Sequence, residues 1–134
     1  KKKESVIDIS EADVLVAVGR CFKTPEALAL AQELADLLGG QLAVTRPLIE
    51  AGLMDTKRQI GLSGRTVAPK LLIVLGVSGA VQFTAGMTGS ETVFAVNIDK
   101  TAPIFDVAHY GIVGDAFEIL PSLIKSIKQM RGLE

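Results

Sequence analysis

Short uninterrupted apolar runs divide the chain into regular steps. The clearest run, Leu-Leu-Ile-Val-Leu at 71–75, has five apolar residues and no alternation with polar ones. Such a run is typical of a strand that is covered on both faces, as in a parallel sheet. Other apolar stretches predict four more strands, over residues 13–18, 42–44, 92–96 and 110–113.

The segment after the first strand carries strong helix signals. Thr24, Pro25 and Glu26 predict a helix start, with Thr as the N-cap, Pro at the first helical position and Glu in the first turn. Apolar residues then recur every three or four positions, which gives the helix one apolar face. The glycine pair Gly39-Gly40 is predicted to end it.

The later helices are shorter or less clearly bounded. A helical turn is predicted over 47–51, and a short helix around 79–87. Residues 53–69 show no period and are predicted to form an irregular connection, which in a small domain is often functional. A closing amphipathic helix is predicted to begin near residue 119, where Pro121 should kink it or mark its true start.

Strands and helices alternate throughout, with apolar strands. This pattern predicts a doubly wound α/β domain, a flavodoxin-like or Rossmann-like three-layer sandwich with a parallel five-stranded sheet. A chain of 134 residues suits one domain, which we place at residues 13–134, with 1–12 as a disordered or linker-like start. Because the chain begins with lysine, we expect a preceding amino-terminal domain to be absent from it.

Charge and cysteine usage narrow the classes of function. The 14 basic and 15 acidic residues nearly balance, so nucleic acid is not an expected partner. No apolar run approaches the roughly 20 residues of a membrane span, so membrane insertion is not expected. Cys21 is the single cysteine, which excludes an internal disulfide and fits a reducing compartment. We expect a cytoplasmic location.

Small and hydrogen-bonding residues follow every predicted strand. Ligands of open parallel sheets bind at the carboxyl ends of the strands. Arginines and helix N-termini suit phosphates, and an acidic residue suits ribose hydroxyls, so the set predicts a site that resembles a dinucleotide site. The strand ends carry Gly19-Arg20, Thr45-Arg46, Val77-Ser78-Gly79, Asn97 and Gly114-Asp115.

Several motifs of other nucleotide-binding and catalytic proteins are missing. The first strand is followed by Gly-Arg-Cys-Phe-Lys-Thr, so the G-x-G-x-x-G fingerprint of nicotinamide dehydrogenases is absent there. No phosphate loop ending in Gly-Lys-Ser or Gly-Lys-Thr occurs, and no metal-ligand spacing exists. His109 is the only histidine and is interpreted as a surface or packing residue. No catalytic or metal-binding residue is therefore predicted.

Several stretches carry a family resemblance. Residues 59–69 read Gln-Ile-Gly-Leu-Ser-Gly-Arg-Thr-Val-Ala-Pro, 75–87 read Leu-Gly-Val-Ser-Gly-Ala-Val-Gln-Phe-Thr-Ala-Gly-Met, and 110–115 read Tyr-Gly-Ile-Val-Gly-Asp. With Asn-Ile-Asp at 97–99 and Ala-Pro-Ile-Phe at 102–105, they resemble the signature of the electron transfer flavoprotein alpha subunit. The resemblance covers most of the chain and implies the carboxy-terminal, FAD-binding domain of that subunit.

The resemblance implies a role for each strand end in holding FAD. Arg20 would meet the phosphates, and Thr45 and Arg46 would approach the isoalloxazine, with the Arg46 guanidinium over the ring. Ser63 would hydrogen-bond near flavin N5. The full set of cofactor-binding residues that it implies is Arg20, Thr45, Arg46, Gln59, Ile60, Gly61, Leu62, Ser63, Ser78, Gly79, Ala80, Val81, Gln82, Phe83, Asn97, Asp115 and Ala116.

Within this set, the segments have different implied partners on FAD. Residues 60–63 would pass the ring as backbone, and 78–82 would cradle the pyrophosphate and ribityl region. Asn97 and Asp115 would hold the adenosine half.

Three positions depart from the family pattern. Phe83 stands where the family usually has a histidine beside flavin O2, and a phenyl ring offers neither a hydrogen bond nor a charge to the reduced ring. Cys21 stands where the family usually has glycine, which narrows the approach of backbone to phosphate. His109 occupies a position where an acid is expected.

The resemblance implies electron relay by FAD, with the protein setting the potential through charge near the ring. The chain would be an electron carrier rather than an enzyme. It would form a heterodimer with an electron transfer flavoprotein beta subunit and accept electrons from an acyl-CoA-type or other flavin dehydrogenase. Two other hypotheses stay open: a regulatory module that holds AMP or NAD without electron transfer, and a flavodoxin-like FMN carrier.

Overall fold

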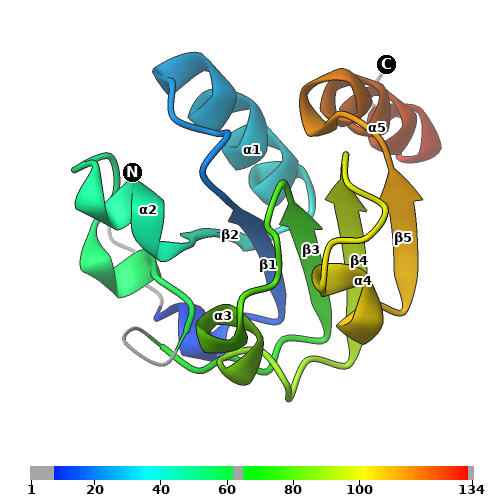
Figure 1. The fold of residues 1–134 in the computed structure, drawn as a ribbon. Coiled ribbons are helices and arrows are strands. Elements are labelled where there is room, and N and C mark those ends of the chain that lie inside the picture. Colours follow the sequence, from blue (N-terminus) through cyan, green and yellow to red (C-terminus); the bar gives the residue numbers. More distant parts are fainter. Residues whose placement is uncertain (1–7, 62–64, 133–134) are drawn as a thin grey trace.

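A five-stranded sheet forms the centre of the fold (Figure 1). The computed structural model describes residues 8–61 and 65–132. All neighbouring strands pair in parallel, which confirms the predicted α/β fold, and the order is that of flavodoxin-like sheets. From one edge to the other, the strands are β2 (Gln41–Val44), β1 (Val14–Val18), β3 (Leu71–Leu75), β4 (Thr92–Asn97) and β5 (Tyr110–Val113).

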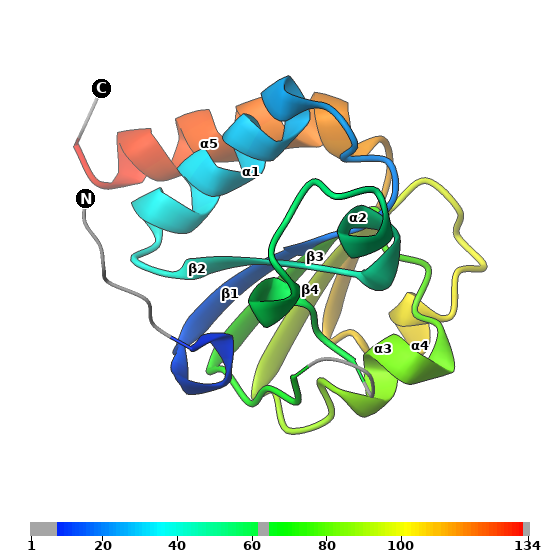
Figure 2. The same cartoon turned by 90° about the vertical axis from the view of Figure 1, so that its left-hand side faces the viewer.

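Helices of different length cover the two faces of the sheet (Figure 2). Two long helices, α1 (Pro25–Leu37) and α5 (Ala116–Met130), contact each other on what we call the long-helix face. The opposite face, which we call the short-helix face, is covered by η1 (Ile9–Glu11), α3 (Val81–Ala85) and α4 (Ile104–Val107).

Strand side chains alternate between these two faces. On β1, Val16 and Val18 belong to the core under the long helices, whereas Leu15 and Ala17 belong to the core under the short ones. Burial on both sides is the reason why the strand sequences show no alternation. β5, at the edge, differs because all four of its residues are exposed.

The long-helix face largely follows the predicted signals. The Thr24 hydroxyl caps α1 by accepting a hydrogen bond from the Ala27 N–H at 3.1 Å, as predicted. The other helix, α5, begins at Ala116, because the Asp115 carboxylate caps it by accepting from the Phe117 N–H at 2.8 Å. Pro121 therefore lies inside α5 and is not its start.

The short-helix face differs more from the prediction. α3 spans only Val81–Ala85, because Gly79 has a φ of +93°, which a right-handed helix cannot contain. α4 was not predicted, since its four residues form a single turn, too short for an apolar period to show. The predicted helix at 79–87 was therefore too long at both ends.

The connection between β2 and β3 is irregular over much of residues 53–69, as predicted, but it forms hydrogen bonds with β2. It contains α2 (Arg46–Glu50) and η2 (Thr56–Arg58). Arg58 donates from Nη1 to the Leu42 carbonyl at 2.8 Å, and Gln59 forms a parallel bridge with Val44. These contacts bring the backbone after η2 to the strand ends.

The domain start at residue 13 stays a prediction. η1 lies before that boundary, and Ile9 in it is buried in the core under the short helices. In the described part of the chain, no helix combines the length and apolar character that crossing a membrane requires.

Candidate functional site

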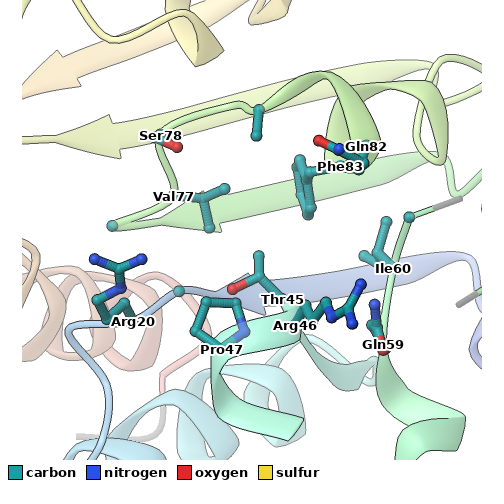
Figure 3. A pocket seen from close by; sticks show the side chains of 14 residues that line it. Arg20, Thr45, Arg46, Pro47, Gln59, Ile60, Val77, Ser78, Gln82 and Phe83 are labelled. Carbon is teal, nitrogen blue, oxygen red and sulfur yellow. The ribbon is translucent and has the colours of Figure 1, made fainter. Parts of the chain in front are cut away.

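The carboxyl ends of the strands surround a cavity of about 520 Å³, which we call the first cavity. Figure 3 shows Val77, Gln82 and Phe83 on one wall and Thr45 and Pro47 on the facing one. The described residues that line it are Gly19, Arg20, Thr45, Arg46, Pro47, Gln59, Ile60, Gly61, Gly76, Val77, Ser78, Ala80, Gln82 and Phe83.

The ends of β1 and β3 meet backbone to backbone beside the first cavity. A Cβ atom on Gly19 would lie 2.4 Å from the Gly76 carbonyl oxygen, closer than a real side chain can come. Gly76 itself has a φ of +68°, a left-handed conformation that favours glycine. Glycine at these two positions therefore lets the ends of β1 and β3 pack closely beside the cavity.

The segment after η2 forms one end of the first cavity. The Ile60 N–H donates to the Val44 carbonyl at 3.1 Å. On its other side, Gly61 lies so close to α3 that a Cβ there would be 3.0 Å from the Gln82 carbonyl oxygen. The segment is thus held between β2 and α3, with its backbone along the cavity.

Two arginines give the first cavity a positive character. Arg20 follows β1, and Arg46 is the first residue of α2; none of the described lining residues is acidic. The Nε of Arg46 donates to Glu50 Oε2 at 2.9 Å, which forms an ion pair between residues four positions apart on α2. Both side chains are largely exposed. Thr45 precedes this helix, and its hydroxyl does not cap it.

Phe83 gives part of the same cavity an apolar wall. The residue is 5% exposed and packs in the core under the short helices. Its ring supplies no hydrogen bond and no charge. Polar contacts to a ligand in the first cavity must come from the arginines, amides, hydroxyls and backbone of the remaining lining residues.

A second cavity of about 370 Å³ adjoins the first, since Arg20 and Gly76 line both. The Phe117 ring forms part of its wall and packs on the buried Phe22 ring, with ring centroids 4.7 Å apart. The described lining residues are Arg20, Cys21, Gly76, Asn97, Ile98, Asp115, Ala116 and Phe117.

Asn97 is held firmly in the wall of the second cavity. The side chain is buried, and its Nδ2 donates to the Val77 carbonyl at 2.9 Å. Its Oδ1 accepts from the Asp99 N–H, also at 2.9 Å. The amide therefore connects the turn after β3 with the turn after β4.

Cys21 lines the second cavity and lies against Gly76, which lines both. A Cβ on Gly76 would lie 2.4 Å from the Cys21 Sγ, so the thiol occupies the space that this glycine leaves open. Burial, and more weakly the negative charge of Asp115, raises the pKa of the thiol above its ordinary value. The thiol is therefore a weaker nucleophile at neutral pH than a free cysteine.

Several known proteins have sequences similar to this one. The family model described as the electron transfer flavoprotein FAD-binding domain matches residues 8–88. The chain belongs to this family. It is 57% identical to the lactate dehydrogenase (NAD(+),ferredoxin) subunit LctC of Acetobacterium woodii over 95% of the chain, and 44% identical to the electron transfer flavoprotein subunit alpha of Thermoanaerobacterium thermosaccharolyticum over 98% of it.

These matches cover only part of the relatives. The chain spans 30% of the Acetobacterium protein and 40% of the Thermoanaerobacterium one. A solved structure described as the crystal structure of a hypothetical protein shares the fold, with a TM-score of 0.54 at 16% identity, over 95% of this chain and 76% of that one.

The described residues fit FAD, the cofactor of this electron transfer flavoprotein family. Two adjoining cavities suit the two halves of a dinucleotide, and Arg20, which lines both, could hold the negatively charged phosphates that would link the halves. Gly19 and Gly76 let the ends of β1 and β3 pack closely beside the first cavity, and the Cys21 Sγ fills the space beside Gly76.

Most of the predicted cofactor-binding residues lie at the cavities. Those at the first cavity are Arg20, Thr45, Arg46, Gln59, Ile60, Gly61, Ser78, Ala80, Gln82 and Phe83, and those at the second are Arg20, Asn97, Asp115 and Ala116.

Four predicted residues are not among the described lining. Gly79 lies behind the wall, where a Cβ would meet the Ile104 nitrogen at 2.4 Å, and Val81 is 75% exposed outside the cavities. Leu62 and Ser63 lie outside the described residues. Their predicted roles remain predictions.

The predicted cofactor-binding set omits seven of the described lining residues: Gly19, Cys21, Pro47, Gly76, Val77, Ile98 and Phe117. Pro47, Ile98 and Phe117 are three of these that were not singled out from the sequence. They sit one or two positions after a predicted strand-end residue, so a search for polar residues alone passes over them. His109 is not among the described residues that line the cavities. Its Nδ1 accepts a hydrogen bond from the Val93 N–H of β4 at 2.9 Å, just before β5 begins, which fits the predicted packing role.

Proposed function

We propose that this chain is the FAD-binding domain of an electron transfer flavoprotein alpha subunit and relays electrons from a flavin dehydrogenase to an acceptor. It works as an electron carrier, in a cytoplasmic heterodimer with a beta subunit. Names of relatives support this role: one is an electron transfer flavoprotein subunit alpha, and another is a subunit of a lactate dehydrogenase that uses NAD and ferredoxin.

The observation that carries the proposal is the pair of adjoining cavities with Arg20 and Gly76 in common. One continuous site of this form suits a ligand with two ring systems and a charged link between them. A mononucleotide such as FMN would use the first cavity alone.

The residues of the chain would divide the work of holding FAD. Arg20 would neutralise the phosphates at the place where the two cavities adjoin. The second cavity, with Asp115 and Phe117, would take the adenosine half, and the first would take the flavin. When bound, FAD supplies one-electron chemistry, and the charges around it set its potential.

Reconstitution with FAD tests the proposal. The purified chain, mixed with excess FAD and desalted, should retain one FAD per chain, seen in the visible flavin absorption and by mass of the released cofactor. Retention of FMN in preference to FAD would favour the FMN carrier. Binding of AMP or NAD with no retention of either flavin would favour the regulatory module.

Arg46 tests the electrostatic part of the proposal. We expect Arg46→Ala to shift the midpoint potential of bound FAD to a more negative value, because a nearby cation favours the negatively charged reduced forms. The control is Lys57→Ala, which removes an exposed cation that does not line either cavity. A redox titration in which Arg46→Ala behaves like the control would contradict the role of Arg46.

A further inference from the structure

Asn97 occupies an unusual place between the two cavities. Its side chain lines the second cavity, yet its Nδ2 donates to Val77, whose side chain lines the first. Its Oδ1 accepts from the N–H of Asp99, which follows Ile98 on the wall of the second cavity. One buried amide thus contacts the walls of both cavities.

The turn after β3 is also held by hydrogen bonds to β4 and to the start of α4. The Gly76 N–H donates to the Val96 carbonyl at 2.9 Å, and the Ile104 N–H donates to the Ser78 carbonyl at 2.9 Å. Gly79 lies directly against the Ile104 backbone. The wall of the first cavity therefore rests on β4, α4 and the turn between them.

We propose that Asn97 is a positioning residue that couples the two cavities, holding the Val77–Ser78 wall of the first while it walls the second. This inference rests on the proposed function, in which FAD spans both cavities. It differs from the role that the family resemblance implies, in which Asn97 acts as a ligand of the adenosine half. A ligand of adenosine acts on the second cavity alone, whereas a coupling residue acts on both.

The substitution Asn97→Asp separates these two roles. The carboxylate keeps the shape of the side chain and can still accept from the Asp99 N–H. The oxygen that replaces Nδ2 would face the Val77 carbonyl with no proton to donate, so two acceptors would repel each other. The wall at Val77 must then move, and the first cavity changes although no residue on the flavin side was replaced.

The experiment uses ligands that report on each cavity. Calorimetric titrations of the chain and of Asn97→Asp are made with FMN for the first cavity, ADP for the second and FAD for both. We expect affinities for FMN and for ADP to fall together, each by about tenfold, the effect of one buried hydrogen bond lost with its partner left unsatisfied. The visible circular dichroism of bound FAD should change as well, because the flavin environment is altered.

Two further variants keep the test decisive. Thr24→Ala removes the cap of α1, away from both cavities, and should leave the affinities and the dichroism of the folded protein unchanged. Asn97→Ser is measured beside Asn97→Asp, because serine also loses the Val77 contact but adds no negative charge that would by itself repel the phosphates of FMN and ADP. The coupling role predicts the joint fall in affinity for both variants, and a joint fall in Asn97→Asp alone would overturn it.

The outcomes separate this inference from the proposed function. A fall in ADP affinity alone, with FMN affinity and flavin dichroism unchanged, would overturn the coupling role and leave the FAD site standing. Unchanged affinities for both ligands would overturn it too. If the unsubstituted chain binds no FAD at saturating concentration, the proposed function fails first, and the coupling role with it.

Discussion

The two faces of the sheet are built in different ways. The long-helix face consists of two amphipathic helices of 13 and 15 residues, and side chains from both pack against the strands. The short-helix face consists of turns and helices of three to five residues, fixed by backbone contacts such as that of Gly79 with Ile104. Both faces bury apolar side chains, but the short-helix face depends in addition on close packing of backbone against backbone.

This difference matters because the turns of the short-helix face form much of the first cavity. A loss of packing on the long-helix face, away from the start of α5 that lines the second cavity, should lower stability and leave the cavities as they are. A change in the backbone contacts of the short-helix face should alter both. The predictions below follow from this contrast.

The largest effect is expected from Gly79→Ala. The new Cβ would meet the Ile104 nitrogen at 2.4 Å and also force alanine to a φ of +93°. Together the collision and the left-handed backbone should lower the free energy of unfolding by roughly 4 kcal/mol, measured by urea denaturation. FAD affinity should fall as well.

Gly39→Ala is the matched control for that prediction. Gly39 has a φ of +70°, but a Cβ there would have no atom within 4 Å. Gly39→Ala should lower the free energy of unfolding only by the cost of the left-handed backbone conformation, about 1 kcal/mol. Equal losses in the two variants would show that the contact of Gly79 with Ile104 is unimportant.

Leu34→Ala tests the long-helix face. Leu34 is fully buried in the core under α1 and α5, so its truncation leaves a cavity and should lower the free energy of unfolding by about 3 kcal/mol. FAD affinity, measured at a temperature where the variant is folded, should not change. A marked loss of affinity would mean that the two faces are not independent.

Thr24→Ala should have a smaller effect on the same face. The hydroxyl of Thr24 satisfies the Ala27 N–H at the start of α1, and the loss of such a cap lowers stability by about 1 kcal/mol. Thr24→Ser keeps a hydroxyl and should restore most of this stability. Chemical denaturation of the three proteins measures the difference.

The smallest effect is expected at Cys21, in the wall of the second cavity. Because its pKa is raised in the folded chain, fewer thiolates are present at pH 8, and iodoacetamide should label folded protein more slowly than protein unfolded in urea. The raised pKa also means that the folded state favours the neutral thiol. Its contribution to stability is therefore complete below the ordinary cysteine pKa and is lost as the pH rises through the folded one.

Cys21→Ser provides the control, since the sequence contains no other cysteine. It should show no labelling, and its stability should fall less steeply at alkaline pH. Labelling of the folded chain at the rate of the unfolded one would contradict the raised pKa of this exposed thiol.

Much of the fold was predictable because its signals are local. The apolar run at 71–75 became β3, and Thr24-Pro25 became the start of α1. The predicted helix boundaries were wrong where a cap or a backbone conformation, and not the apolar pattern, decides where a helix begins. Asp115 caps α5 before the apolar pattern starts, and the positive φ of Gly79 excludes the first predicted residues of α3 from a helix.

The candidate site was predictable for a related reason. Since parallel strands end at the same edge of a sheet, residues that follow each strand gather there, and Arg20, Thr45, Ser78 and Asp115 do so. Apolar lining such as Phe117 was missed, because a residue of that kind has the same pattern in a core as in a cavity wall.

By itself, the sequence determined the order of strands and helices, the family and the edge of the sheet that carries the site, because apolar runs, caps and motifs are properties of neighbouring residues. Only the tertiary structure decided that the site is two cavities joined at Arg20 and Gly76, and that Asn97 connects their walls. Those contacts join residues about 20 or more positions apart, such as Asn97 and Val77, and depend on how closely the backbones of separate strands approach.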